Sequence, residues 1–552
     1  MACRYAKTRV TVPFQAGWFA SARRSADDGW KSSMMKRPIR RAGLWLTFVL
    51  AVLQPSLLPA TSEHVVVVVW DGMRPDFVSP SLTPNLYALA TNGVFFKRHH
   101  ALYISSTEVN GTGIATGCHP EHSGIIANVD YRPELGWLGT NPTEGLDNIR
   151  RGDQLSAGRY LLVPTLAEIL HQAGIPTAIA GSKQVVFLHD RARLRTGAAT
   201  NSVLVYAGNV LPRAAAETVR KGTEDKEFPA SAIPNRERDQ WTTKALAKGL
   251  WHNGVPKFSL LWLSEPDASQ HASAPGSSNA LAGVESSDKQ LGEIVKILGE
   301  KHVLDKTDFL ITADHGFSTV GRQVDVLELL KRAGFKVFRR FEDPERGDVL
   351  VVGLGGSICL YVVEHDEAVT RRLVAFLQTT DFAGVIFSRM PTPGTFPLET
   401  VRLNAPNVEP DVVVSLRWSA DRNEHGAPGL LVSEGGKGTG THGSLSPFDM
   451  RPNLVACGPS FKRGVVSAVP TGNIDITPTV LHLLGVKQPP VMDGRVLQEA
   501  LVGSEVPPSE PQTKSLEATA ESGLFRWRQT LKVTQVGQAV YFDEGNGAAE
   551  IR

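Results

Sequence analysis

Seven residues at five places along the chain have side chains that could bind divalent metal ions. They are Asp71, Thr107, Asp267, His271, Asp314, His315 and His442. Carboxylate oxygens and imidazole nitrogens are ligands that suit zinc. Two zinc ions about 3.5–4 Å apart can stabilise both the attacking and the leaving oxygen during a displacement at phosphorus. These residue types therefore predict metal-assisted hydrolysis, provided that the fold brings them together.

The three aspartates of this set each follow a run of residues typical of a buried strand, at residues 65–70, 258–263 and 308–313. Because the carboxyl ends of parallel strands meet at one edge of a sheet, we expect the aspartates to lie close together. Asp267 and His271 are four residues apart, so one turn of helix would put both on the same face. Asp314 and His315 are adjacent, and they can reach one ion only where the chain bends at a strand end.

Thr107 lies at the start of a helix that we predict over residues 106–116. A nearby cation would favour its alkoxide form, and the free N–H groups and dipole at a helix amino terminus would stabilise the same charge. Threonine at a helix start is also a common N-cap, so the residue alone leaves a nucleophile and a cap as alternatives. His442 follows the glycine-rich residues 435–440, where a solvent-exposed histidine would be equally ordinary.

Strand-like and helix-like segments alternate from about residue 64, which predicts the α/β class. We expect a doubly wound, mostly parallel sheet with helices on both faces, in a domain that spans residues 61–500. Further strand-like pieces with long connections predict a smaller inserted α+β lobe at about residues 335–435. Residues 501–552 then form a Pro-containing linker and a C-terminal strand or hairpin.

Residues 1–60 have the composition of a leader, with the true start expected at Met34 or Met35. A basic segment at 35–41, an apolar segment at 42–53 and small residues near 58–60 are typical of a secretion signal. The apolar segment is short for a membrane span. We therefore predict export to the periplasm or the extracellular medium, with membrane attachment only through an uncleaved leader.

The overall composition excludes several classes of protein. With 42% hydrophobic and 21% charged residues, the chain is neither disordered nor a polytopic membrane protein. The leader contains 10 Lys or Arg and 2 Asp, which leaves 48 basic and 54 acidic residues elsewhere, so there is no nucleic-acid footprint. The three cysteines outside the leader, Cys118, Cys359 and Cys457, are too few and too scattered for a disulfide framework and are expected to be buried. The oligomeric state is not indicated.

A series of short motifs occurs in a fixed order along most of residues 64–490. They lie at residues 69–76, 83–86, 106–107, 116–117, 122–128, 264–267, 312–316, 441–443 and 475–479. With these motifs the chain resembles the alkaline phosphatase superfamily and, within it, the type I phosphodiesterase/nucleotide pyrophosphatase family. The resemblance implies hydrolysis of a small phosphoester or nucleotide-like substrate with two zinc ions, although the same donors suit other divalent metals.

The resemblance also implies roles for individual residues. One zinc ion would be held by Asp71, Asp314, His315 and the Thr107 oxygen. The other would be held by Asp267, His271 and His442. Thr107 would attack phosphorus to give a phospho-threonine intermediate, which is then hydrolysed. Asn128, otherwise a common turn residue, would donate from its amide to a phosphate oxygen.

Two departures from the family pattern bear on the substrate. Nucleotide-cleaving members usually have an aromatic residue after the nucleophile, where it stacks on the base, but this chain has Glu108. In place of a Trp-Pro-Gly signature the chain has Ser182 and Lys183, which resemble the phosphomonoesterase branch, where a lysine binds the phosphate. A second cation expected two residues further on is replaced by Val185. Lys183 is therefore either a substrate-binding residue or a solvated lysine.

Several functions remain open after these comparisons of motifs. A phosphodiesterase or pyrophosphatase accounts best for the whole set of motifs. A phosphomonoesterase and a phosphonate hydrolase use the same ligands. An inactive binding relative would usually lack a metal ligand, and none is missing from this sequence.

Overall fold

The computed structural model describes residues 62–136, 138–191, 202–504, 509–522 and 524–551. The predicted leader lies outside these residues. Within them, no helix is both long and apolar enough to cross a membrane. Cys118, Cys359 and Cys457 are free and buried, as the sequence predicts.

The centre of the fold is a nine-stranded sheet in the order β22-β2-β21-β10-β1-β9-β6-β7-β8. Its middle strand, β1 (His64–Trp70), runs parallel to β10 (Thr307–Thr312) on one side and to β9 (Phe258–Leu263) on the other. Next to β9 lies β6 (Thr177–Gly181), which is also parallel. Most neighbouring strands in this sheet run parallel, and the predicted α/β class is confirmed.

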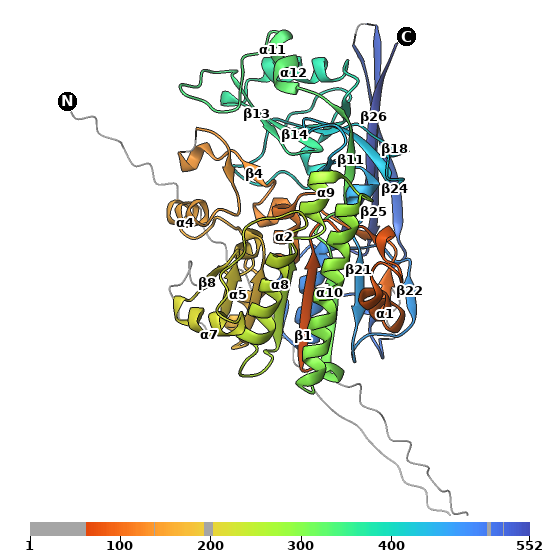
Figure 1. The fold of residues 1–552 in the computed structure, drawn as a ribbon. Helices are drawn as coiled ribbons and strands as arrows, with labels where there is room; N and C mark the ends of the chain where they lie inside the picture. Colours follow the sequence, from red (N-terminus) through yellow and green to blue (C-terminus); the bar gives the residue numbers. More distant parts are fainter. Residues whose placement is uncertain (1–61, 137, 192–201, 505–508, 523, 552) are drawn as a thin grey trace, which may run out of the picture. The chain divides into compact units, whose positions relative to one another are not determined.

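Helices cover both faces of this sheet, as expected for a doubly wound fold. The odd-numbered residues of β1 from Val65 pack with one set of helices, α2 (Thr107–Thr116), α5 (Leu166–Gln172) and α14 (Ile476–Leu483). The even-numbered residues pack with the other set, α1 (Pro84–Asn92), α8 (Arg236–Lys244) and α10 (Ser278–Glu300). In Figure 1, α8 and α10 lie beside β1. Because successive strand side chains point to opposite faces, the valine run of β1 is buried on both sides.

A second sheet of six strands follows in the order β12-β13-β14-β17-β15-β16. Its members are β12 (Val337–Phe338), β13 (Val349–Gly353), β14 (Ser357–Val362), β17 (Val412–Leu416), β15 (Ala383–Ser388) and β16 (Phe396–Pro397). The helices α11 (Val326–Arg332) and α12 (Glu367–Leu377) pack on it (Figure 1). This sheet occupies the part of the chain in which the sequence predicts an inserted lobe, whose boundaries remain a prediction.

The end of the chain forms an antiparallel sheet of three long strands, β24 (Gln512–Ser522), β25 (Phe525–Val536) and β26 (Ala539–Ile551). This sheet packs against the six-stranded sheet. The indole N–H of the buried Trp527 donates to the Gly394 carbonyl at 3.0 Å. The Gln529 side chain accepts from the Ile386 N–H at 2.8 Å and donates to the Ile386 carbonyl at 3.1 Å. Two buried side chains of β25 therefore fix it to the six-stranded sheet, Gln529 to β15 and Trp527 to the segment between β15 and β16.

Candidate active site

The three predicted aspartates meet at the carboxyl edge of the nine-stranded sheet. Asp71 directly follows β1, Asp314 follows β10, and Asp267 begins the helix α9 (Asp267–Ser273) after β9. The Asp267 N–H donates to the Asp71 carbonyl at 2.9 Å, and the Gly72 N–H donates to Asp314 Oδ1 at 3.0 Å. All three aspartates are buried. Backbone hydrogen bonds between neighbouring strand ends therefore hold them in one place.

Two histidines complete a first group of donors around Asp267. His271 lies one turn further along α9, with its Nε2 3.2 Å from Asp267 Oδ1. His442 follows β20 (Gly440–Thr441), which pairs with β11 (Ser318–Gln323), and its Nε2 lies 3.7 Å from Asp267 Oδ1. Donor atoms of Asp267, His271 and His442 all lie within 4.8 Å of one another.

A second group forms around His315. Its Nε2 lies 3.1 Å from Asp314 Oδ2 and 3.7 Å from Asp71 Oδ1. Thr107 Oγ1 lies 3.2 Å from the same nitrogen. The two groups are neighbours, because the His315 and His442 rings stack with their centroids 3.6 Å apart. All seven residues that the sequence singled out are thus brought together at one edge of the sheet.

Thr107 does not act as a helix cap. It is the first residue of α2, and the N-cap residue Ser106 makes no side-chain capping hydrogen bond. Asn128 reaches the same turn, because its Oδ1 accepts from the Glu108 N–H at 3.1 Å. This bond uses the amide oxygen and leaves the Asn128 NH₂ group to donate elsewhere. The hydroxyl and the amide predicted to act on the substrate therefore lie at the same helix terminus.

Unpaired oxygen atoms show that this site fits metal ions. Asp71 Oδ1, Asp267 Oδ1 and Asp314 Oδ2 are buried, and none has a hydrogen-bond partner within the described residues. Buried carboxylates are normally paired, or they coordinate metals. Burial, together with the nearby Asp314, raises the pKa of Asp71 well above its usual value. The donors are carboxylate oxygens and imidazole nitrogens, which is the set that zinc accepts.

The electrostatics of the two groups differ. Burial disfavours a charged His315, but the carboxylates of Asp314 and Asp71 raise its pKa to about 9. Burial raises the pKa of Asp267, but the charges of Lys183 and His271 outweigh burial and hold it well below its usual value. For His442, burial dominates and lowers the pKa well below its usual value, which favours the neutral imidazole that metals require.

Lys183 also lies in this site. It follows β6, and its Nζ lies 3.0 Å from Asp71 Oδ2 and 3.0 Å from Asp267 Oδ2. Its side chain is only 26% exposed, so it is not a freely solvated lysine. The prediction that it binds the substrate phosphate stays a prediction.

Trp262 is a member of the site that the sequence did not single out. Its indole N–H donates to Asp71 Oδ2 at 2.8 Å from the adjacent strand β9, where Trp262 pairs with Val69. A tryptophan in an otherwise apolar buried strand needs a partner for its N–H group, and this is the only signal that the sequence offered. The partner could be identified only once β1 and β9 were known to be neighbours.

Glu108 takes the place after Thr107 and is 6% exposed. Burial raises its pKa well above the usual value, and the neighbouring Glu144 raises it further. A carboxyl group cannot stack on a base, so the structure has no stacking side chain at the position where nucleotide-cleaving members have an aromatic residue. Val185 is fully buried in the core and supplies no second cation.

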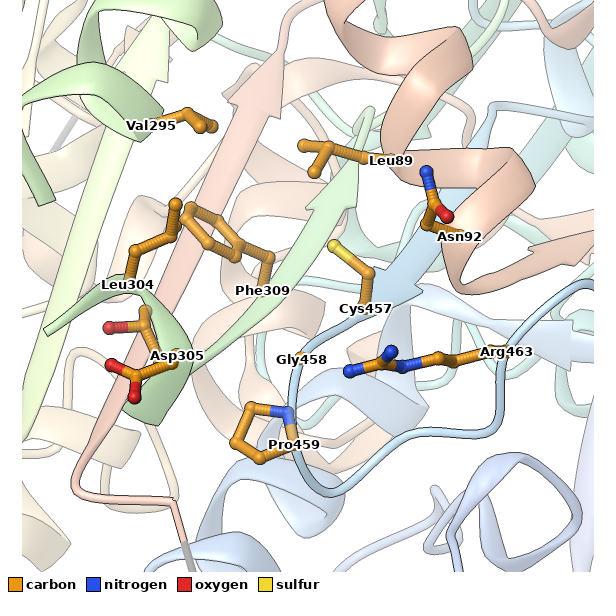
Figure 2. A pocket seen from close by; sticks show the side chains of 11 residues that line it. Leu89, Asn92, Val295, Leu304, Asp305, Phe309, Cys457, Gly458, Pro459 and Arg463 are labelled. Carbon is orange, nitrogen blue, oxygen red and sulfur yellow. The ribbon is translucent and has the colours of Figure 1, made fainter. Parts of the chain in front are cut away.

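A cavity of about 320 Å³ lies elsewhere in the molecule (Figure 2). Its lining includes Thr307 at the start of β10 and Cys457 at the end of the antiparallel β21 (Leu454–Cys457). It therefore lies at the opposite end of β10 from Asp314. Figure 2 shows apolar side chains around the Cys457 thiol, with Arg463 at one side. No metal-site candidate lines this cavity.

Comparison with known families agrees with this geometry. The profile of the family described as "Type I phosphodiesterase / nucleotide pyrophosphatase" matches residues 65–429. The chain belongs to this family. The resemblance seen in the sequence is thereby confirmed, and the protein is a hydrolase of a family in which metal dependence is general.

Individual relatives are distant. Ectonucleotide pyrophosphatase/phosphodiesterase family member 7 of Rattus norvegicus is 22% identical over 432 residues, which is 78% of this chain and 84% of the relative. The structure of human ectonucleotide pyrophosphatase/phosphodiesterase 5 matches with a TM-score of 0.56 and 17% identity, covering 80% of this chain and 100% of that chain. An inactive form of the murine protein in complex with AMP matches with a TM-score of 0.53 and 16% identity, covering 78% and 96%. These structures confirm the alkaline phosphatase-like fold.

Proposed function

We propose that the protein is an exported two-zinc phosphodiesterase or nucleotide pyrophosphatase that acts through a phospho-threonine intermediate. The observation that supports this most strongly is the position of Thr107. Its hydroxyl lies 3.2 Å from His315 Nε2, at a helix amino terminus, and the His315 ring stacks on His442 of the other group of donors. A hydroxyl in this setting is poised for nucleophilic attack.

The family resemblance divides the donors between two ions. The first would be held by Asp71, Asp314, His315 and the Thr107 oxygen. The second would be held by Asp267, His271 and His442. When bound, the ions supply electrostatic stabilisation of the attacking and leaving oxygens. Other divalent metals are compatible with the same donors.

The chain's own residues account for the remaining parts of the reaction. The Thr107 hydroxyl loses its proton to solvent, and its Oγ–phosphorus bond forms as the bond from phosphorus to the leaving oxygen breaks. The leaving oxygen takes up a proton from solvent. Water then adds to phosphorus, and the Oγ–phosphorus bond breaks to restore the hydroxyl. The Asn128 amide, held by the Glu108 N–H, is placed to donate to a non-bridging phosphate oxygen. Burial of Thr107 excludes bulk water from the nucleophile.

A small phosphoester or nucleotide-like molecule is the proposed substrate. Family membership and the AMP complex of the murine relative support this choice. A phosphomonoesterase is the second candidate, because Lys183 brings an ammonium group into the site, where it could neutralise a dianionic phosphate. A phosphonate hydrolase would use the same ligands. An inactive binding relative is disfavoured, because all seven donors are present and close together.

Substitution of the nucleophile tests this proposal. Thr107→Ala should lower kcat on a p-nitrophenyl diester by roughly a thousandfold or more, because the attacking oxygen is removed. Thr107→Ser keeps the oxygen and should retain measurable hydrolysis. Undiminished hydrolysis by Thr107→Ala would contradict the proposal.

Two further measurements address the remaining parts of the proposal. Metal analysis of the purified protein should find two zinc ions per chain. Cell fractionation of the producing organism should find the protein in the periplasm or the medium rather than in the cytoplasm.

A further inference from the structure

Lys183 lies between the two groups of donors and contacts one carboxylate of each. The family resemblance assigns Asp71 to the ion held with His315 and Asp267 to the ion held with His271 and His442. Donor atoms of Asp267 also lie within 4.8 Å of those of Asp71 and His315. Lys183 Nζ is 3.0 Å from the Oδ2 atom of both aspartates. It is the one lysine of the described residues that is ion-paired with both of these carboxylates. The Lys183 ammonium group thus contacts one carboxylate assigned to each of the two ions.

The two oxygen atoms of each carboxylate have different neighbours. On both aspartates the Oδ2 atom faces Lys183, whereas the buried Oδ1 atom faces a histidine. Asp71 Oδ1 lies 3.7 Å from His315 Nε2, and Asp267 Oδ1 lies 3.2 Å from His271 Nε2. Asp71 Oδ2 also accepts from the Trp262 indole. For Asp267 Oδ2, Lys183 is the only donor within the described residues. Groups that hold one oxygen of a metal-binding carboxylate orient the other oxygen toward the metal.

The backbone that bears Lys183 is anchored to the segment that precedes Asp267 and α9. The neighbouring Ser182 donates its hydroxyl to Asp239 Oδ1 at 2.6 Å. The same Asp239 carboxylate accepts the N–H groups of Ser264 at 2.8 Å and Glu265 at 3.1 Å, just before Asp267. Asp239 is fully buried. The backbone next to Lys183 and the backbone next to Asp267 are therefore both held by the buried Asp239. This anchoring fixes the distance between Lys183 and Asp267.

We propose that Lys183 is a positioning residue that orients one carboxylate of each metal-binding group and so couples the two sites. The proposal rests on the proposed function, because it assumes that both groups bind metal. It differs from a role in binding the substrate phosphate. The ammonium group donates to Asp267 Oδ2 and is ion-paired with Asp71 Oδ2, so both aspartates engage it. Removing Lys183 would also remove its repulsion of a bound cation, but the loss of the only donor to Asp267 Oδ2 should outweigh that gain.

Metal binding to purified full-length protein tests the proposal without reference to activity. Zinc dissociation constants would be measured by competition with a chromogenic chelator, and cobalt-substituted protein would report ligand geometry through its visible spectrum. Lys183→Met should weaken zinc binding at both sites by roughly ten- to a hundredfold and change the cobalt spectrum. Lys183→Arg keeps the positive charge and the N–H donors, so it should bind zinc more tightly than Lys183→Met and have a cobalt spectrum closer to that of the wild type. The exposed Lys289→Met on α10 is the matched control and should change neither.

Kinetics separate positioning from phosphate binding. If Lys183 positions the ligands, Lys183→Met should lower hydrolysis of a p-nitrophenyl monoester and a matched diester by similar factors. Unchanged or tighter zinc binding by Lys183→Met, or a loss confined to the monoester, would overturn the proposal.

The zinc content of the wild-type protein tests the proposed function independently of the role of Lys183. If the wild-type protein bound no zinc, the proposed function itself would fail. If it bound two zinc ions and Lys183→Met did the same with equal affinity, only the role of Lys183 would fail. A circular dichroism spectrum checks that each variant is folded, and the Lys183→Arg result keeps the test decisive if Lys183→Met does not fold.

Discussion

The two ends of strand β10 differ in the kinds of side chain that surround them. At the carboxyl end, Asp314 and its neighbours Asp71 and Asp267 keep buried oxygen atoms without hydrogen-bond partners among the described residues. At the amino end, the buried Asp308 also keeps one oxygen without a hydrogen-bond partner among these residues, but the cavity of Figure 2 is lined mainly by apolar side chains. Burial there raises the pKa of the Cys457 thiol to about 12, which keeps the thiol neutral and unreactive. Three buried carboxylates gathered beside imidazoles, rather than the size of a cavity, therefore mark the chemically active end.

The largest effect should follow from removing a charge at the carboxyl end. Asp71→Asn keeps the shape of the side chain but removes the negative charge on an oxygen expected to bind metal. We expect loss of one zinc ion per chain and a fall in kcat of roughly a thousandfold. Metal analysis and steady-state kinetics would measure both.

Asp305 offers a matched control, because it is an exposed aspartate that lines the cavity at the amino end. Asp305→Asn should change neither the zinc content nor kcat. If Asp71→Asn and Asp305→Asn lowered zinc content and kcat equally, the two ends of β10 would not differ in function.

A smaller effect should follow from removing the amide that faces the substrate. Asn128→Ala should lower kcat by about a hundred- to a thousandfold, because one donor to the developing negative charge is lost. Zinc content should stay at the wild-type level, since no metal-binding atom is removed. A normal kcat in this variant would show that Asn128 is only a turn residue.

The charge state of His315 predicts how metal-free protein responds to pH. Because the carboxylates beside it raise the pKa of His315 to about 9, the folded state holds a proton that the unfolded state releases near pH 6.5. The stability from this proton is fully present below pH 6.5 and is lost as the pH rises to about 9. Urea unfolding of chelator-treated protein between pH 6.5 and 9 should show this decline, and His315→Ala should abolish it. A flat profile in this range would contradict the charged His315.

The smallest effect should follow from changing the other end of β10. Cys457→Ala removes a buried thiol that borders the cavity and should cost about 1–2 kcal/mol of stability, measured by urea unfolding. Its kcat and zinc content should equal those of the wild type. A selective loss of activity would show that the amino end takes part in the reaction.

Much of the site could be predicted where a ligand lies close to a strong local signal. Asp71, Asp267 and Asp314 follow runs of strand residues, and parallel strands bring their carboxyl ends to one edge. The sequence could therefore place the aspartates together without knowing the strand order. The spacing of Asp267 and His271 likewise predicted that they share a helix face, and the structure has both on α9.

Other members could not be placed from local signals. His442 reaches the site because β20 pairs with β11, an arrangement that glycine-rich sequence does not encode, and only the family resemblance identified it. The contact of Lys183 with Asp71 and Asp267 depends on β6, β9 and β1 being consecutive in the sheet. The long strands β24 to β26 depend on pairing with one another and on docking through Trp527, neither of which a search for short hydrophobic runs can detect.

Anomalous diffraction from crystals grown with zinc tests the central claim most directly. We predict two peaks at the zinc absorption edge, about 4 Å apart, at the carboxyl edge of the nine-stranded sheet. One should lie among Asp71, Asp314 and His315, next to the Thr107 oxygen, and the other among Asp267, His271 and His442. Peaks elsewhere in the molecule, or no peaks in a protein that hydrolyses phosphoesters, would contradict the account.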